Sequence, residues 1–112
     1  MIQIGKIKSV SFGLGGYENS MLGLEVSLGG SGWGCMTSEM AWDANKVKVD
    51  KYACWTESDR AKQYSKIMYF LSDLLAKAKV NNVSKLKDIP IEATFDGPNG
   101  KLTSWRILEE VL

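Results

Sequence analysis

The sequence predicts an α+β fold in which an antiparallel or mixed β-sheet packs against one long amphipathic helix. Residues 58–80 carry apolar side chains at the spacing of one helical face. Residues 2–28 and 89–108 instead contain stretches of alternating apolar and polar side chains, broken by glycine-containing turns. A helix of this length must cover its apolar stripe with another element, and a sheet made from the two hairpins is the simplest partner.

The N-terminal hairpin comes first in the chain. Its first strand is predicted over residues 2–14, where apolar side chains share one parity until the phase breaks near residues 6–8. Such a break indicates a β-bulge. Residues 15–20 form a turn cluster, and residues 22–28 alternate cleanly as a second strand. Because the connection is short, we expect the two strands to pair antiparallel.

The segment between this hairpin and the helix is the hardest to interpret. Residues 29–32 are rich in glycine and indicate a turn, after which a third strand is expected to begin at residues 33–36. Residues 37–45 suggest an irregular excursion or a short helical turn. Residues 47–55 predict a weaker strand with lysines on its solvent side.

The helix itself has clear boundary signals. Thr56 or Ser58 can cap its start, and Thr56 and Asp59 have the spacing of a capping box. Asn81-Asn82 would end it in the left-handed conformation. The predicted apolar face consists of Tyr64, Ile67, Met68, Leu71, Leu74, Leu75 and Ala78. The opposite side carries ordinary charged residues, so we expect the helix to stabilise the fold rather than to bind a partner.

A second hairpin closes the chain. It follows a linking turn at residues 83–88. Pro90 lies near the start of a strand predicted over residues 89–95, where its missing N–H does least harm. A strong turn signal at residues 96–100 and the alternation over residues 102–108 complete the hairpin.

The composition restricts the functions that the chain can have. With 45% hydrophobic residues, the chain 1–112 can bury a core, and we expect it to form one domain. There is no histidine, which removes the commonest general base and metal ligand. Cys35 and Cys54 cannot form a zinc tetrad alone. A disulfide between them is one alternative, but we expect them to be free and buried. We therefore expect no metal, no cofactor and no enzymatic activity.

Charge and hydropathy bear on partners and location. A formal net charge of +1 gives no general field that attracts nucleic acid or an anionic membrane. The first ten residues lack the pattern of a signal peptide, and no apolar run approaches the ~20 residues of a membrane span. We therefore expect a protein of a reducing, cytoplasm-like compartment.

Two glycine-rich stretches, residues 13–16 and 30–34, invite a nucleotide-binding interpretation. Neither continues as Gly-Lys-Ser/Thr, and neither opens a helix within a βαβ unit, so neither fits a known phosphate-binding fingerprint. Turns and bulges in a twisted sheet are the better interpretation. A small-ligand site in which these loops line a pocket stays as one alternative function.

Aromatic residues outside the helix are the strongest candidates for a binding surface. Trp and Tyr are enriched at binding hot spots because each gives a large rigid surface with a polar handle. Tyr17 and Trp42 have polar neighbours and are expected to be exposed, whereas for Trp33 a core position competes with a binding role. The candidate binding residues are Tyr17, Glu18, Asn19, Trp33, Trp42 and Asp43.

A nucleic-acid-binding surface is the other alternative. Lys46, Lys48 and Lys51 lie close in sequence to several aromatic residues. Lysines beside exposed rings can form a stacking and cationic platform for single-stranded nucleic acid. The near-neutral net charge argues against this alternative.

Four stretches of the chain together carry a resemblance to other proteins. They are GKIKSVSFGLGGY at 5–17, GWG at 32–34, LKDIPIEATFDG at 86–97 and SWRILEEVL at 104–112. Together they resemble a group of small uncharacterised proteins encoded by tailed bacteriophages and prophages. The resemblance implies a genomic setting but no assigned activity or catalytic residue.

The leading hypothesis combines this setting with the composition. It is a non-enzymatic phage accessory protein that binds a host macromolecule, most simply a host protein, with inhibition of antiviral defence as one form of that activity. Homo-oligomerisation stays open, because the sequence does not show which strand edges are covered.

Overall fold

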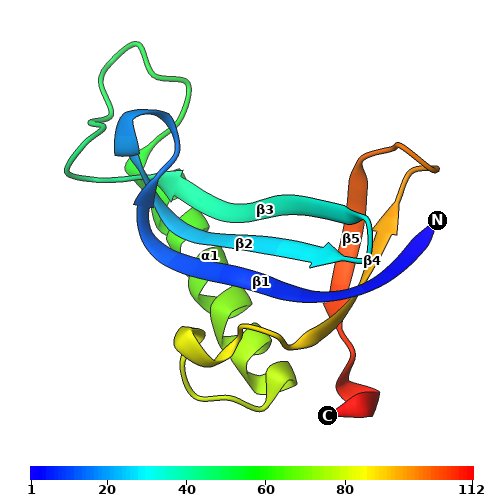
Figure 1. The fold of residues 1–112 in the computed structure, drawn as a ribbon. Helices are drawn as coiled ribbons and strands as arrows, with labels where there is room; N and C mark the ends of the chain where they lie inside the picture. The colour runs from blue at the N-terminus through cyan, green and yellow to red at the C-terminus, as the bar shows by residue number, and fades with distance from the viewer.

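The computed structural model describes all 112 residues, which form one five-stranded antiparallel sheet and one long helix (Figure 1). The strand order is β3-β2-β1-β4-β5. The elements are β1 (Ile2–Gly15), β2 (Met21–Gly30), β3 (Trp33–Trp42), α1 (Glu57–Ala78), β4 (Pro90–Phe95) and β5 (Leu102–Ile107), with short 3-10 turns η1 (Tyr17–Asn19), η2 (Val83–Lys85) and η3 (Glu109–Val111). The predicted α+β class is confirmed, and the antiparallel form of the sheet is the one observed.

The long strand β1 joins the two hairpins. Residues 2–6 pair with β4, and residues 6–15 pair with β2. The register between β1 and β2 shifts between Ile7 and Ser9, which confirms the bulge predicted near residues 6–8. The C-terminal hairpin runs at a steep angle to β2 and β3 (Figure 1). A bulge bends a strand and increases its local twist, which is consistent with this change of direction.

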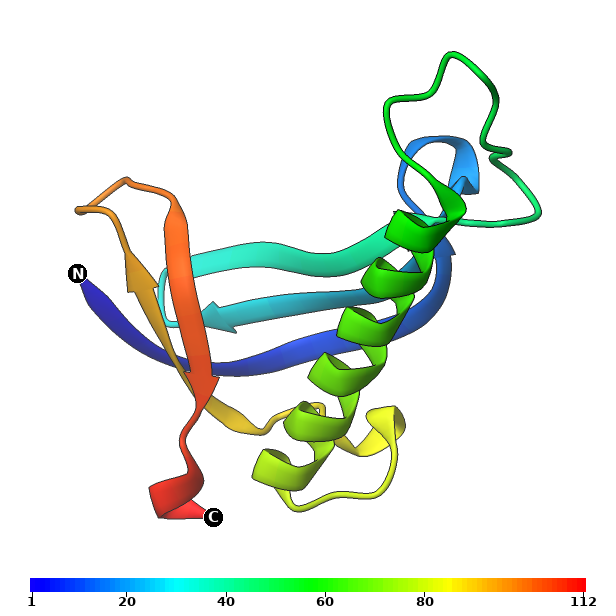
Figure 2. The same cartoon turned by 180° about the vertical axis from the view of Figure 1, so that it is seen from behind.

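The helix α1 crosses one face of the sheet diagonally (Figure 2). In β2, Leu24, Val26 and Leu28 are buried in the core, whereas the alternate residues Glu25 and Ser27 face the other side. The buried core cluster consists of Ile7, Leu24, Val26, Leu28, Leu74, Ala78, Leu86, Ile91, Ala93 and Ile107. No element covers the opposite face of β1, β2 and β3 in either view (Figures 1 and 2).

The two ends of α1 illustrate one correct and one wrong prediction. Thr56 Oγ1 accepts from Asp59 N–H at 3.2 Å, and the Asp59 carboxylate accepts from Thr56 N–H at 2.9 Å, so the capping box is confirmed. The helix ends at Lys79 (φ 59°) rather than at Asn81-Asn82. The amide of Val80 donates to the carbonyl of Leu75 at 3.1 Å. The Val80 side chain packs against the core. Burial of this apolar residue fixes the end of the helix before the asparagines.

The prediction for residues 37–55 was wrong in two respects. β3 continues to Trp42, because it pairs with β2 along its whole length. Residues 47–55 form no strand. The carbonyl of Val47 accepts a hydrogen bond from Arg60 instead of joining a ladder. β3 is an edge strand with one uncovered face, so its side chains need not be apolar and its pattern is weak.

Candidate functional site

One end of the sheet gathers most of the candidate residues. The turn η1 joins β1 to β2, and the loop after β3 leaves the sheet at the same end (Figure 1). Asp43 N–H donates to the carbonyl of Ser20 at 2.9 Å and ties the loop to the hairpin connection. We call residues 17–20 and 42–56 the aromatic end.

Three aromatic side chains are exposed at the aromatic end. The exposed fraction is 77% for Tyr17, 82% for Tyr52 and 36% for Trp42. The Lys51 ammonium nitrogen lies 5.1 Å from the centre of the Tyr52 ring, a cation–π contact. Exposed tyrosine and tryptophan on separate segments provide rigid, amphipathic contact area, which is the composition of binding hot spots.

The backbone of η1 projects its residues outward. Glu18 and Asn19 both have positive φ, at 51° and 55°. Asparagine tolerates this conformation, but glutamate adopts it rarely. The Ser20 hydroxyl donates to the carbonyl of Tyr17 at 2.6 Å and closes the turn. Strained residues of this kind occur often at functional sites, so η1 is a reasonable part of a recognition surface.

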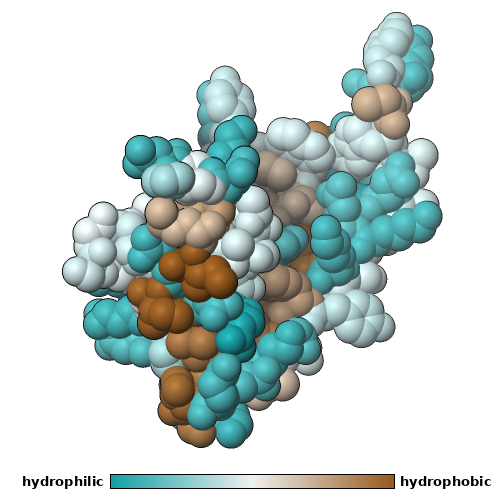
Figure 3. Space-filling model, turned by 90° about the vertical axis from the view of Figure 1, so that its right-hand side faces the viewer, coloured by the Kyte–Doolittle hydropathy of each residue, from teal (hydrophilic) through white to brown (hydrophobic).

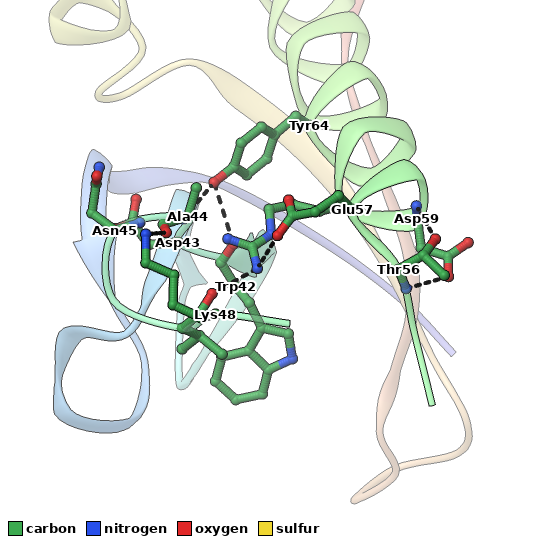
Figure 4. Close-up of polar contacts among 11 residues, drawn as sticks. Trp42, Asp43, Ala44, Asn45, Lys48, Thr56, Glu57, Asp59 and Tyr64 are labelled. Carbon is green, nitrogen blue, oxygen red and sulfur yellow. Dashed lines mark hydrogen bonds and ion pairs between the residues drawn. The ribbon is translucent and has the colours of Figure 1, made fainter. Parts of the chain in front are cut away.

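The loop of the aromatic end is fastened at its start by Tyr64 of α1 (Figure 4). The Tyr64 hydroxyl accepts from Ala44 N–H at 3.0 Å and donates to the carbonyl of Trp42 at 3.3 Å. Asp43 is buried, and its carboxylate accepts from Asn45 N–H at 3.1 Å. The candidate residue Asp43 therefore shapes the loop from within, whereas Trp42 beside it is exposed.

Arg60 fastens the middle of the loop and is 2% exposed. Its Nη2 donates to the carbonyl of Val47 at 2.6 Å and lies 3.2 Å from the Glu57 carboxylate. The guanidinium also stacks on Trp55. Nε and Nη1 of Arg60 are buried without a hydrogen-bond partner. One buried cation thus joins the loop to the first turns of α1.

Sequence reasoning missed Arg60, although a signal was present. Arg60 lies four residues before Tyr64, in phase with the apolar stripe of the helix. A charged residue on a stripe that faces the core must find partners there, because an isolated buried charge is costly. Such a position indicates an anchor for a segment that lies outside the regular elements.

The lysines of the nucleic-acid alternative lie in a segment that also carries carboxylates. Lys48 donates to the carbonyl of Ala44 at 2.8 Å, and Lys51 lies over Tyr52. Residues 43–60 contain four cations and four carboxylates, so the charge of this part of the chain is balanced. A phosphate backbone is attracted by an excess of positive charge, which is absent here.

Trp33 lies at the opposite end of β3, apart from Tyr17 and Trp42. Its ring meets Phe95 edge-on, with the ring centres 5.4 Å apart, and packs against the core. The ring covers the backbone at Gly5, where an added Cβ would lie 2.6 Å from the indole Cζ2. Tyr17, Glu18, Asn19, Trp42 and Asp43 are brought together at the aromatic end, and Trp33 is not.

A methionine-rich surface on the uncovered face of the sheet was also missed. Met21, Met36 and Met40 line a shallow depression of about 510 Å³, whose lining residues Gly16 and Met21 adjoin the aromatic end in the chain. Methionine is flexible and polarisable and adapts to irregular partner surfaces. Met36 and Met40 share the parity of Trp42 in β3, but this pattern is visible only if the strand is known to reach Trp42.

One of the two glycine-rich stretches contributes to a hollow. The hollow measures about 410 Å³ and lies between the β2–β3 turn and the β4–β5 turn. Trp33 and Phe95 line it with aromatic surface, and the remaining lining comes from Met1, Gln3, Gly32, Gly34, Gly97, Pro98, Asn99 and Gly100. Its size falls within the usual range for small-molecule sites. Residues 13–16 take no part in it.

Both cysteines are free thiols, as predicted. Cys35 is half-buried, but Cys54 is exposed, so the prediction that both are buried was wrong for Cys54. Burial raises the pKa of the Cys35 thiol, which favours the unreactive protonated form. No group of three His, Cys, Asp or Glu side chains is arranged to hold a metal ion.

Comparisons with known proteins give no identification: no protein-family model matches the chain, and neither curated proteins nor solved structures show a significant match. The helix α1 is not apolar enough to cross a membrane. The fold and the side chains of the aromatic end are therefore the basis for a functional proposal.

Proposed function

We propose that this protein is a phage or prophage accessory protein that binds a host protein through the aromatic end and acts without catalysis, in the host cytoplasm. Inhibition of an antiviral defence protein is the form of this activity that we favour. The observation that carries the proposal is the display of Tyr17, Trp42 and Tyr52 on a turn and a loop that Arg60 and Tyr64 hold in place.

Holding the loop and its exposed rings in one conformation favours tight binding. Binding is weakened by the entropy lost when a loop becomes ordered, and a loop that is already held loses less of it. The aromatic end is fastened at Asp43, Ala44 and Val47 by bonds to η1 and α1. Tyrosine and tryptophan add little further cost because each has only two side-chain torsions.

The chemistry of the surface favours a protein partner over other macromolecules. It displays exposed rings, and residues 43–60 of the same region carry balanced charges. Aromatic anchors with a polar rim are the usual anatomy of a protein–protein interface. The adjoining Met36 and Met40 extend the surface with adaptable apolar side chains.

The test is capture of a host protein by the full chain. The immobilised protein is exposed to a lysate of the bacterial host, and the bound proteins are identified and quantified. A double Tyr17→Ser and Tyr52→Ser variant is expected to bind the captured protein about tenfold or more weakly, because truncated hot-spot residues cost most of the affinity. Tyr69→Ser is the matched control, since Tyr69 is 78% exposed on α1, outside the aromatic end.

Three outcomes would contradict this proposal. The first is that no protein is captured in stoichiometric amount. The second is that the double variant captures the partner as well as the original chain does. The third is that Tyr69→Ser loses the partner to the same degree, which would mean that any exposed tyrosine of the molecule matters equally.

The hollow between the two glycine-containing turns supports a second candidate function, binding of a nucleotide or metabolite. Its aromatic lining from Trp33 and Phe95 suits a planar ligand. We expect that one member of a nucleotide and metabolite panel raises the melting temperature if this function is correct. No change across a broad panel would exclude most such ligands.

A further inference from the structure

Half of β1 has a free edge. The amide of Ile7 donates to the carbonyl of Ile89, and its carbonyl accepts from Asp88 N–H. After Ile7, no strand pairs with the side of β1 that faces away from β2. Residues 9–15 therefore present unpaired backbone donors and acceptors along this side. An open edge of this length is a template for pairing with another strand.

An apolar groove runs beside this free edge. Phe12 is 42% exposed and Leu14 is 49% exposed, both on the side of the sheet that faces α1. Together with α1, β1 and β2 enclose a groove of about 230 Å³ lined by Phe12, Leu22, Gly23, Tyr64, Ile67 and Met68. Met68 is 56% exposed at its rim. An added strand could place alternate side chains in this groove while its backbone pairs with β1.

The residues of the free edge and the lining of the groove beside it carry no charged side chain. Residues 9–15 read Ser-Val-Ser-Phe-Gly-Leu-Gly. The adjoining surface of α1 is formed by Tyr64, Ser65, Met68, Tyr69 and Ser72, which are also uncharged. Natural edge strands are commonly protected by charged side chains or proline, and this edge has neither after the bulge at Lys8.

A second exposed apolar surface lies near the termini, and unlike the groove beside β1 it has charged neighbours. Figure 3 shows a band of apolar side chains on the side of the molecule where both termini lie. Exposed apolar residues near the termini are Met1, Ile2, Ile4, Val111 and Leu112. In the ladder, Ile4 pairs with Glu92, which pairs with Arg106, so charged residues lie beside these exposed apolar residues.

We propose that the free edge of β1 binds a second copy of this chain, in antiparallel pairing about a twofold axis. In a twofold contact the same surface faces itself, so any charged residue near the axis would meet a like charge. The uncharged edge residues and groove satisfy this requirement, whereas partners of different sequence are usually selected by complementary charge. Phe12, Leu14 and Met68 of each copy then cover the groove of the other, and the two five-stranded sheets become continuous.

The experiment measures the mass of the intact protein in solution by light scattering and sedimentation over a range of concentrations. The original chain is expected to show twice the monomer mass of 12.4 kDa. Phe12→Lys and Met68→Lys are each expected to shift it to the monomer, because the twofold axis would bring two added cations together. Ile4→Lys and Met36→Lys change exposed apolar residues elsewhere and are expected to keep the dimer.

Mixing two oppositely charged variants distinguishes a variant that cannot dimerise from a variant that does not fold. Phe12→Lys and Phe12→Glu should each be monomeric alone, with the circular dichroism of the original chain, and should form a dimer when mixed. A monomeric original chain overturns the proposal, as does a dimer that survives both Phe12→Lys and Met68→Lys. Loss of the dimer in Ile4→Lys or Met36→Lys also overturns it, because pairing would then use another surface.

Discussion

The guanidinium carbon of Arg60 lies 4.8 Å from the centre of the Trp55 ring, and this stacked pair joins the loop of the aromatic end to the first turn of α1. Trp55 lies at the end of the loop, and Arg60 reaches from there to Val47 near its middle. A single side chain therefore contacts the loop at two places. The loop has no regular structure of its own, so its shape depends on this contact.

Arg60→Ala is expected to lower the free energy of unfolding by about 1–3 kcal/mol, because the carbonyl of Val47 loses a charged donor in a buried place. Amide hydrogen exchange should accelerate in residues 44–55 more than in the strands. Lys62→Ala, an exposed change on the same helix, is the control and should stay within about 0.5 kcal/mol. Unchanged exchange in residues 44–55 would show that other contacts hold the loop.

Thr56→Ala is expected to destabilise the protein by about 1 kcal/mol, because the Asp59 amide loses the side-chain acceptor of the capping box. Urea denaturation measures the change. Ser58→Ala lies in the same turn, and its hydroxyl makes no capping bond, so it should have a smaller effect. Equal losses in the two variants would mean that the cap contributes nothing specific.

Glycine at position 5 is required by close packing. An added Cβ at Gly5 would clash with the carbonyl of Gly29 and lie 2.6 Å from the Trp33 ring. Gly5→Ala should therefore lower the free energy of unfolding by about 1–3 kcal/mol. At Gly34 the nearest atom to an added Cβ is 3.6 Å away, so Gly34→Ala should be close to neutral. Thermal and urea unfolding of both variants would contradict this account if Gly5→Ala were the milder change.

The ion pair between Glu110 and Arg106 should make stability depend on pH in the acid range. Two hydrogen bonds from Arg106, at 3.0 and 3.1 Å, lower the pKa of Glu110 below its ordinary value. The pair therefore stabilises the fold above the ordinary glutamate pKa, and this contribution disappears as the pH falls through the lower folded pKa.

The difference in melting temperature between the original chain and Glu110→Gln should accordingly be positive at neutral pH and shrink towards zero in acid. Glu39→Gln is the control, since Glu39 makes no ion pair. The effect is expected to be small because both partners are substantially exposed. A difference that grows as the pH falls would contradict the lowered pKa.

Local signals in the sequence predicted most of the fold correctly. The apolar period of residues 58–80, the capping box and the alternation in residues 22–28 each depend on neighbours in the chain. β3 beyond Met36 was missed because its backbone pairs with β2 across the sheet, and its polar side chains carry little pattern. The alternation in residues 47–55 predicts a strand, but no strand lies beside this segment, so it forms a loop.

The candidate site was predictable only in part. The polar neighbours of Tyr17 and Trp42 correctly indicated exposure. These two residues share one end of the sheet, and Trp33 lies at the other. This placement follows from the register of β2 and β3, which the local sequence around each residue does not show. Tyr52 was among the aromatic residues of the loop, but only the fold shows how far it projects.

The amine of Met1 donates to the carbonyl of Phe95 at 2.9 Å, and the two residues are 94 positions apart in the chain. The central strand is synthesised before the strands on either side of it, and its first half acquires a neighbour only when β4 leaves the ribosome. Until then β2 can pair with the second half of β1, whereas the first half of β1, which contains Ile2 and Ile4, stays unpaired. Contacts of such long separation close slowly, and unpaired apolar strands are prone to aggregate during synthesis. A chain stopped before β4 should therefore collect in the insoluble fraction, even though its N-terminal hairpin is complete.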